Sequence, residues 1–263
     1  MQFTDQLNRK VNLENHPQRI ISLVPSQTEL LVDLGLEENI VGVTKFCVHP
    51  KNLRKEKQIV GGTKGIRTDR IKALNPDIIL CNKEENTREM IADLEKDFQL
   101  HISDIHTIED TYELISQYGD LFDVKEKADE INEKIRKQIQ LFRDFIKDKP
   151  KLKVAYFIWR KPWMVVGRDT FVNHLLEMNH FENVYADIPR YPEVDIDQLK
   201  PTDFILLSSE PFPFAEKHRQ ELLPYVNNTD IIFVDGEFFS WYGSRLAAAF
   251  KYFKKLRAEM YQI

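Results

Sequence analysis

Residues 19–31 read RIISLVPSQTELL, and Ile40-Val-Gly-Val43 follows shortly after them. The apolar run at the start of this stretch is typical of a short buried strand. Ser26 and Glu29, three residues apart, predict a capping box at the start of a helix, and Gly35 predicts its left-handed end. Residues 40–43 predict the next strand. A strand, a helix and a second strand in this order form a β-α-β unit with parallel strands.

The same alternation continues after this unit. Helices are predicted at 68–74, 87–96 and 108–122, with strands at 77–81 and 98–102. Before Arg19, apolar residues alternate with polar ones, which predicts a short hairpin at the edge of a sheet. The first part of the chain therefore predicts an α/β lobe.

Residues 124–147 break this pattern, because they contain neither Gly nor Pro and show no strand-like alternation. Apolar residues recur there at intervals of three and four, which predicts one amphipathic helix of about 24 residues, about 36 Å long. Its other face carries lysines and acidic residues at spacings that permit side-chain pairs. This helix is either an ordinary solvated helix or a rigid strut.

After Pro150 the alternation of strands and helices resumes. It predicts strands at 153–158, 164–166, 203–207 and 231–234, and helices at 170–178, 216–223 and 240–261. The fold class is therefore α/β, with two Rossmann-like β-α-β lobes joined by one long backbone helix. The predicted division is residues 1–122 for the first lobe, 123–149 for the helix and 150–263 for the second lobe.

The composition excludes several classes of protein. The 263 residues include 37 Lys and Arg against 42 Asp and Glu, a net charge of −5, which argues against a protein that binds nucleic acid. Cys47 and Cys81 are too few for a disulfide framework or a thiolate metal site, and we expect both to be buried. No apolar run approaches the roughly 20 residues of a membrane span.

Enzyme signatures are missing. There is no G-x-S-x-G motif, and Gly61-Gly-Thr-Lys-Gly65 lacks the spacing of a phosphate-binding loop, so it predicts a tight turn. The seven histidines are scattered without metal-ligand spacing. We therefore expect neither catalysis nor a metal site. A cluster of ligands from distant positions, as in a divalent-ion receptor, stays open as an alternative.

Aromatic residues gather in segments predicted to follow strands. Trp159 and Trp163 follow one strand, Trp241 follows another, and Pro211-Phe-Pro-Phe214 adds two more rings. In α/β folds, ligands bind beyond the carboxyl ends of the strands, and aromatic rings there can stack on a large flat ligand. Each ring taken singly could cap the core of its lobe, but the set favours a ligand cleft.

Several segments together resemble one family. Residues 19–30, Gly35 and 40–43 resemble its opening, and Leu74-Asn-Pro-Asp-Ile-Ile-Leu80 resembles its L-x-P-D strand. Gly167-Arg-Asp-Thr-Phe171 and the closing Asp235-Gly-Glu-Phe-Phe-Ser-Trp-Tyr-Gly-Ser-Arg245 resemble turns of a second lobe. In this order the segments resemble the helical-backbone (class III) substrate-binding proteins of ABC importers. Within that family the likeness is to cobalamin-binding receptors, with haem and ferric-siderophore receptors as relatives.

The resemblance implies a function without catalysis and without a cofactor of its own. A metal-chelate ligand, cobalamin first and otherwise haem or a ferric siderophore, would bind in a cleft between the lobes and pass to a membrane permease. The implied ligand contacts are Pro25, Ser26 and Gln27, then Lys64 and Gly65, and from the second lobe Trp159, Trp163, Tyr191, Phe238, Phe239, Trp241, Tyr242 and Arg245. Arg245 would pair with an anionic group of the ligand or cap the preceding loop. The candidates for docking on the permease are Glu84, Glu85, Glu89 and Glu216.

The resemblance also implies a location in the periplasm or cell envelope. The amino terminus shows no signal peptide, so the chain would be cytoplasmic if the sequence as written is complete. We expect a monomer that binds a small molecule and a permease, with no nucleic acid and no membrane-spanning segment. The alternatives are a cytoplasmic cofactor-handling protein or enzyme on the same scaffold, and a divalent metal ion receptor.

Overall fold

The computed structural model describes residues 2–261. Contacts divide the chain into two compact units. The first unit contains the chain up to Arg136 together with Trp241–Leu246. The second contains Lys137–Ser240 and the chain from Ala247 onward. The short segment Trp241–Leu246, which lies far along the chain, therefore packs with the first unit.

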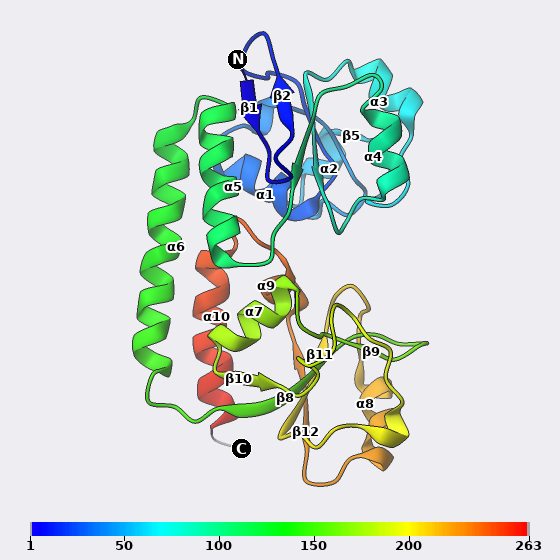
Figure 1. The fold of residues 1–263 in the computed structure, drawn as a ribbon, viewed down its shortest axis with the longest axis vertical. Coiled ribbons are helices and arrows are strands. Elements are labelled where there is room, and N and C mark those ends of the chain that lie inside the picture. Colours follow the sequence, from blue (N-terminus) through cyan, green and yellow to red (C-terminus); the bar gives the residue numbers. More distant parts are fainter. Residues whose placement is uncertain (1, 262–263) are drawn as a thin grey trace. The chain divides into compact units, whose positions relative to one another are not determined.

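A five-stranded parallel sheet with the order β5-β4-β3-β6-β7 forms the centre of the first unit, and its edge strand β5 is labelled in Figure 1. Its strands are β3 (Ile20–Ser22), β4 (Ile40–Val43), β5 (Gln58–Ile59), β6 (Ile78–Asn82) and β7 (Leu100–Ser103). Its helices are α1 (Pro25–Asp33), α2 (Leu53–Glu56), α3 (Thr68–Leu74), α4 (Arg88–Leu94) and α5 (Ile108–Leu121), with a 3₁₀ turn at Glu37–Asn39.

The core on one face of this sheet is closed by α3 and α4. Ile71 of α3 and Leu94 of α4 pack against Ile79 and Cys81 of β6, and all four side chains are buried. β6 is buried along its whole length, as expected for a central strand of a parallel sheet covered on both faces. Cys81 and Cys47 are free thiols and fully buried, which confirms the prediction from their number and kind.

The amino-terminal hairpin is confirmed, but it does not extend a larger sheet. β1 (Gln2–Thr4) and β2 (Lys10–Asn12) pair antiparallel in a sheet of two strands. The buried carboxylate of Asp5 accepts hydrogen bonds from the backbone N–H groups of Leu7 and Arg9 in the turn, and from that of Ile102 at 3.1 Å. This one carboxylate therefore shapes the turn and attaches the hairpin to β7.

The predicted capping box of Ser26 and Glu29 is wrong. The helix begins two residues earlier, since Val24 stands at the N-cap without a side-chain hydrogen bond and Pro25 is the first helical residue. Proline is favoured at the first helical position because its fixed φ suits the helix and it has no N–H to satisfy. Gly35 does follow the helix with a φ of 84°, as predicted.

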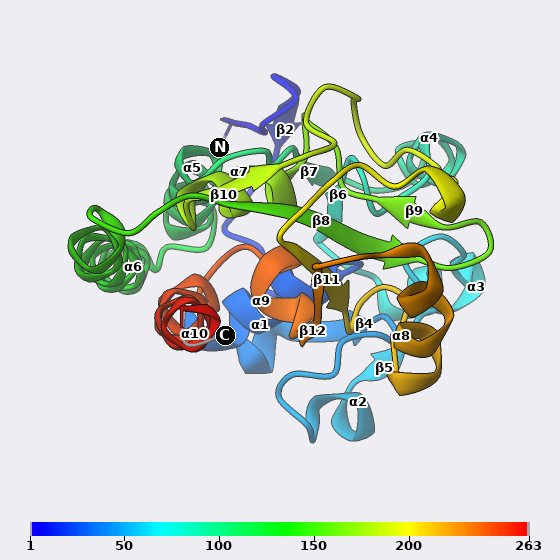
Figure 2. The ribbon, with the colours of Figure 1, turned by 90° about the horizontal axis from the view of Figure 1, so that it is seen from below.

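The second unit contains a sheet with the order β10-β8-β11-β12, whose strands run parallel, and β9 pairs antiparallel with β8 (Figure 2). The strands are β8 (Leu152–Trp159), β9 (Met164–Val165), β10 (Phe181–Asn183), β11 (Phe204–Ser208) and β12 (Asp230–Val234). The helices are α7 (Phe171–Met178), α8 (Glu216–Leu222), α9 (Gly236–Ser240) and α10 (Leu246–Met260), with 3₁₀ turns at Ile196–Gln198 and Leu223–Tyr225. The sequence-based prediction did not include β5, β10, α2 or α9.

The long helix is confirmed as α6 (Lys125–Ile146), which is 22 residues long and continuous through the boundary between the units (Figure 1). Its buried residues recur at the predicted spacing. In the first unit Asn132 donates to Ser116 Oγ of α5 at 3.1 Å. In the second unit Phe142 packs its ring against Phe250 and Phe253 of α10.

The predicted closing helix over 240–261 is confirmed only from Leu246 onward. α9 ends at Ser240, and α10 begins only at Leu246. Gly243, between them, has a φ of 93°, a left-handed conformation that an α-helix cannot contain and that glycine adopts without steric cost. The break lets Trp241–Leu246 leave the second unit and pack in the first.

Candidate functional site

The carboxyl ends of the parallel strands place several loops at one edge of the first sheet, where α/β folds bind ligands. The loop after β4 carries Phe46, which is 48% exposed. The Lys45 ammonium lies 4.9 Å from the centre of its ring. Phe46 is not among the contacts predicted from the sequence, although it is an aromatic residue just after a strand, the same signal that pointed to the tryptophans.

Gln27 and Tyr242 form a buried polar network in the first unit. The Gln27 amide donates to the Tyr242 hydroxyl at 2.9 Å and to Ser103 Oγ at 2.6 Å. Its carbonyl oxygen accepts from the Tyr118 hydroxyl at 2.8 Å. Burial raises the pKa of Tyr242 above its ordinary value, so this phenol stays protonated. The network uses the polar atoms of Gln27 inside the protein and holds Tyr242 on β7 and α1.

Arg245 makes a two-pronged ion pair with Glu29. Its Nε lies 2.7 Å from one carboxylate oxygen and its Nη2 lies 2.8 Å from the other. The Arg245 side chain is 11% exposed and Glu29 is 20% exposed. The same guanidinium lies 4.8 Å from the ring centre of Trp241, and the rings of Trp241 and His49 meet edge-on at 5.4 Å. Arg245 thus attaches the 241–246 segment to α1, a partner outside both alternatives left open by the sequence.

The remaining predicted contacts of the first unit differ in exposure. Pro25 and Ser26 are buried at the start of α1. Lys64 and Gly65 are exposed in a turn closed by a hydrogen bond of 2.7 Å from Gly62 N–H to the Gly65 carbonyl, so the predicted tight turn is confirmed. Trp241, Tyr242 and Arg245 were expected on the second lobe, but they lie in the first unit.

Four aromatic side chains form a continuous cluster in the second unit. Trp159, 40% exposed at the end of β8, meets the ring of Phe212 edge-on at 5.6 Å. Phe212 contacts Phe214 at 4.9 Å, and Phe214 stacks on Trp163 with an angle of 12° between the rings. Phe214 belongs to the hydrophobic core of this unit, and Trp163 and Phe212 pack against that core. We call Trp159, Trp163, Phe212 and Phe214 the aromatic cluster.

The other predicted aromatic contacts are less exposed than Trp159. Phe239 is fully buried against Tyr156 and Phe253, so it belongs to the core. Phe238 is half-buried and stacks on Tyr252 at 4.8 Å. Tyr191 is half-buried, with the Arg190 guanidinium 5.6 Å from its ring centre.

The four predicted docking glutamates fall into two groups. Glu84 and Glu85 are half-buried after β6, and the Asn82 side-chain oxygen accepts from their backbone N–H groups at 2.9 and 3.2 Å. Glu89 and Glu216 are exposed in the first turns of α4 and α8. The Glu216 carboxylate accepts from the Gln220 amide at 2.6 Å.

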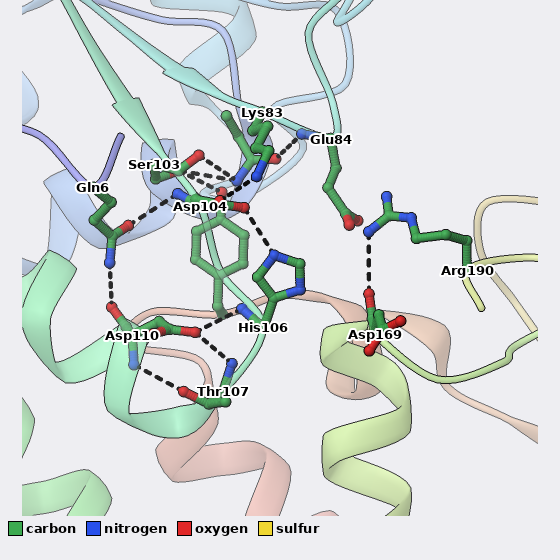
Figure 3. A network of polar contacts seen from close by, with 12 residues as sticks. Gln6, Lys83, Glu84, Ser103, Asp104, His106, Thr107, Asp110, Asp169 and Arg190 are labelled. Carbon is green, nitrogen blue, oxygen red and sulfur yellow. Dashed lines mark hydrogen bonds and ion pairs between the residues drawn. The ribbon is translucent and has the colours of Figure 1, made fainter. Parts of the chain in front are cut away.

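A charged cluster at the ends of β6 and β7 was not recognised in the sequence (Figure 3). One Asp104 oxygen lies 2.5 Å from Lys83 Nζ, and the other lies 3.0 Å from His106 Nε2. The Asp110 carboxylate accepts from the backbone N–H of His106 at 2.8 Å, as part of the capping box of α5. Lys83 directly follows one strand and Asp104 follows its neighbour, a pattern that could have signalled the cluster.

Two further observations concern the described part of the chain. Residues 2–261 contain no group of three or more His, Cys, Asp or Glu side chains placed to hold a metal ion. Within the same range, no helix combines the length and the apolar character needed to cross a membrane.

Comparisons with known proteins agree on one family. The sequence profile described as periplasmic binding protein matches residues 20–207. The ABC transporter substrate-binding lipoprotein YvrC of Bacillus subtilis, itself uncharacterised, is 28% identical over 196 residues, which span 70% of this chain and 60% of the relative. The vitamin B12-binding protein of Pectobacterium carotovorum is 26% identical over 240 residues, 89% of this chain and 86% of the relative. A periplasmic haem-binding protein of Pseudomonas aeruginosa has the same fold, with a TM-score of 0.79, 21% identity and coverage of 91% of this chain and 92% of that one.

Proposed function

The chain belongs to the periplasmic binding protein family, and from this premise we propose that it is the substrate-binding protein of an ABC importer. It captures a metal-chelate ligand, cobalamin first and otherwise haem or a ferric siderophore, and delivers it to a permease. The protein works by reversible binding, without a chemical step. Two kinds of surface are then needed for this function: one that contacts the ligand and one that contacts the permease.

The observation that carries the proposal is the aromatic cluster at the end of β8. Trp159 offers a partly exposed ring, while Phe212 supports it from the side and Phe214 and Trp163 connect it to the core. A ring held in this way loses little conformational freedom when a ligand stacks on it. Tetrapyrroles and aromatic chelates present large flat surfaces, for which stacking on tryptophan is favourable.

The first unit has an exposed surface of different chemistry. Phe46 offers a second exposed ring, and Lys45 places a positive charge over it. Haem and corrinoids combine an apolar ring system with carboxylate or phosphate groups. An aromatic ring beside an ammonium group suits both parts of such a ligand.

Tryptophan fluorescence tests the proposal. We expect cobalamin, haemin or a ferric siderophore to quench the fluorescence of the protein and to raise its Tm. Trp159→Ala should weaken binding about five- to tenfold, because one stacked ring contributes roughly 1–1.5 kcal/mol. The control is Tyr225→Ala, which removes another exposed ring, 45% exposed, from the 3₁₀ turn that precedes β12. If no chelate quenches the fluorescence or raises the Tm, the proposed function is wrong.

Glu89 and Glu216 are the proposed contacts with the permease. Both are exposed in the first turn of a helix, one in each unit, where a carboxylate is available to a basic partner surface. We expect the paired charge reversal Glu89→Lys and Glu216→Lys to abolish binding to the reconstituted permease while leaving ligand affinity unchanged. The control is the paired reversal Glu37→Lys and Glu38→Lys in the Glu37–Asn39 turn, which changes the net charge by the same amount.

A further inference from the structure

We propose that the first unit carries a basic surface that binds an anionic lipid bilayer. The choice of a bilayer as the partner rests on the proposed function, since the binding protein of an importer meets its permease at a membrane. The surface itself is defined by its charge, by its place in the fold and by the lack of ion pairs within it.

Charge is distributed unevenly along the chain. Residues 45–72 contain nine Lys and Arg against two Asp and Glu, a net charge of +7, whereas the remaining residues carry a net charge of −12. A chain that is acidic as a whole therefore contains one strongly basic segment. Such a local excess of charge attracts a partner of opposite charge.

The fold places this segment at one edge of the first sheet. Among the described strands, β5 pairs only with β4, and Figure 2 shows α2, β5 and α3 next to one another at this edge. Leu53 is the buried residue of α2, while Arg54 and Lys55 are exposed. Lys57 directly precedes β5, and the backbone N–H of Arg67 donates to the carbonyl of the residue directly after β5 at 2.7 Å. We call Lys51, Arg54, Lys55, Lys57 and Arg67 the basic surface.

The charges of the basic surface are not neutralised from within. Lys51, Lys55, Lys57 and Arg67 form no ion pair with any residue from 2 to 261, whereas Lys72, close by in sequence, lies 2.7 Å from a carboxylate oxygen of Asp97. Arg54 Nη1 donates to a backbone carbonyl at 2.9 Å, which carries no charge. The positive charge of this surface is therefore available to an external anion.

Protection of the sheet edge does not explain the basic surface. Lysines within an edge strand discourage pairing with another chain, but β5 consists of Gln58 and Ile59 alone. The Arg70 guanidinium already donates to the Ile59 carbonyl at 2.8 Å. The basic surface lies outside the strand, in the segments before and after it.

Lysine predominates in the basic surface, which favours a bilayer over a nucleic acid. A lysine is a flexible point charge, suited to the many mobile negative charges of a lipid surface, and each Lys or Arg there strengthens binding roughly fivefold. Nucleic acids are typically bound by arginine forks and stacked aromatic rings. Here one of the two arginine forks, that of Arg54, is engaged with the protein's own backbone.

The basic surface also adjoins the proposed permease contact of the same unit. The Asn86 amide donates to the Thr63 carbonyl at 2.8 Å, which joins the turn before Arg67 to the loop that leads into α4. Glu89 lies in the first turn of α4. Docking through Glu89 would therefore bring the basic surface near the bilayer around the permease.

Sedimentation with lipid vesicles tests the proposal. We expect the protein to bind vesicles of phosphatidylcholine mixed with phosphatidylglycerol, but not vesicles of phosphatidylcholine alone. Binding should disappear in about 0.5 M NaCl, where the screening length falls to a few ångströms. The triple variant Lys51→Gln, Lys55→Gln and Lys57→Gln should lower the partition coefficient about tenfold or more.

The matched control is the triple variant Lys125→Gln, Lys134→Gln and Lys137→Gln, which removes the same charge from three exposed lysines of α6. It should lower the partition coefficient less than about twofold, because lysines outside the basic surface do not contact the lipid. Equal losses in the two triple variants, or no binding to anionic vesicles, would refute the proposal. Tighter binding to a DNA duplex than to the vesicles would refute it as well.

Binding of cobalamin and haemin, measured by tryptophan fluorescence, separates this inference from the proposed function. We expect the Lys51, Lys55 and Lys57 triple variant to bind the chelate as the unaltered protein does. If the variant loses the chelate together with the vesicles, these lysines belong to the ligand site and the inference is wrong. If the vesicles bind as expected but no chelate binds, the proposed function fails and the basic surface stands.

Discussion

Single side chains in this protein show how distant partners decide what a polar residue does. Gln27 and Arg245 both lie in segments that resemble ligand-contacting loops, yet each is engaged inside the first unit. The Gln27 partner Tyr242 is 215 positions away in sequence, and the Arg245 partner Glu29 is 216 positions away. A polar side chain near a strand end can bond a ligand or a neighbouring segment, and the choice depends on which segments the fold brings together.

At His101 the tertiary structure decides the charge of a side chain. Its ring is buried on β7, with Nε2 2.9 Å from the side-chain oxygen of Gln117 and the ring edge against Tyr118. Burial lowers the pKa of His101 from 6.5 to about 4, because a charged imidazolium would lose its hydration. The folded protein therefore holds this histidine neutral.

We predict that stability falls as the pH drops from about 6.5 towards about 4, because the unfolded chain binds a proton on His101 more tightly than the folded chain. This contribution is fully present above pH 6.5. From the pKa difference we expect a loss of about 2 kcal/mol between pH 7 and pH 5. Urea unfolding at several pH values measures it. His101→Gln, which cannot titrate, should lose stability less steeply over this range, and an identical slope would contradict the prediction.

The helices and strands follow local sequence closely where their ends carry their own signals. α3 spans Thr68–Leu74 as predicted, because Asn75 adopts a left-handed conformation directly after it and a proline follows. Thr107 begins α5 with a capping box that includes Asp110. The capping signal at Ser26 was misread, yet helix α1 forms there and only its first residue differs from the prediction. The closing helix starts six residues later than predicted, because the left-handed conformation of Gly243 ends any helix before it.

We predict that Gly243→Ala destabilises the protein by about 1–3 kcal/mol. The φ of Gly243 is 93°, which alanine adopts only with strain. The atom nearest to the added Cβ would be Cβ of Leu30, at 3.4 Å, so the expected loss comes mainly from the backbone conformation. Gly65→Ala is the control, since an added Cβ there meets nothing within 4 Å and the residue is exposed. It should change the unfolding free energy by less than about 0.5 kcal/mol. Equal losses in urea unfolding of the two variants would contradict this reason for the break.

At the scale of the whole molecule, the chain forms two units with separate hydrophobic cores. The first core is centred on β3, β6 and β7 with α3 and α4, and the second includes β8, β11 and the inner aromatic side chains. The tryptophans are divided between them, with Trp241 in the first unit and Trp159 and Trp163 in the second. Multi-domain proteins often depart from two-state unfolding, so each core should respond chiefly to its own substitutions.

We predict that Leu207→Ala, in the buried centre of β11, destabilises the second unit by about 2–5 kcal/mol. In a Trp241→Phe background, the fluorescence of the remaining tryptophans should report an earlier urea transition. In a background where Trp159 and Trp163 are phenylalanine, the transition reported by Trp241 should move less. Ile79→Ala in the first unit is the matched variant, with the opposite pattern expected. Equal shifts of both reporters in both variants would show a single cooperative unit.

The sequence by itself determined the α/β class, the long helix and nearly every strand, because these depend on the spacing of apolar residues and on capping residues a few positions apart. Tertiary structure decided which polar and aromatic residues face solvent. Only the fold brings Tyr242 to Gln27, Arg245 to Glu29 and Asp104 between Lys83 and His106. Pairs of this kind link different loops at the ends of strands, and no local pattern encodes which loops meet. Burial and pairing between distant segments therefore identify residues that hold the protein together, and the exposed side chains stay candidates for contact with the proposed ligand.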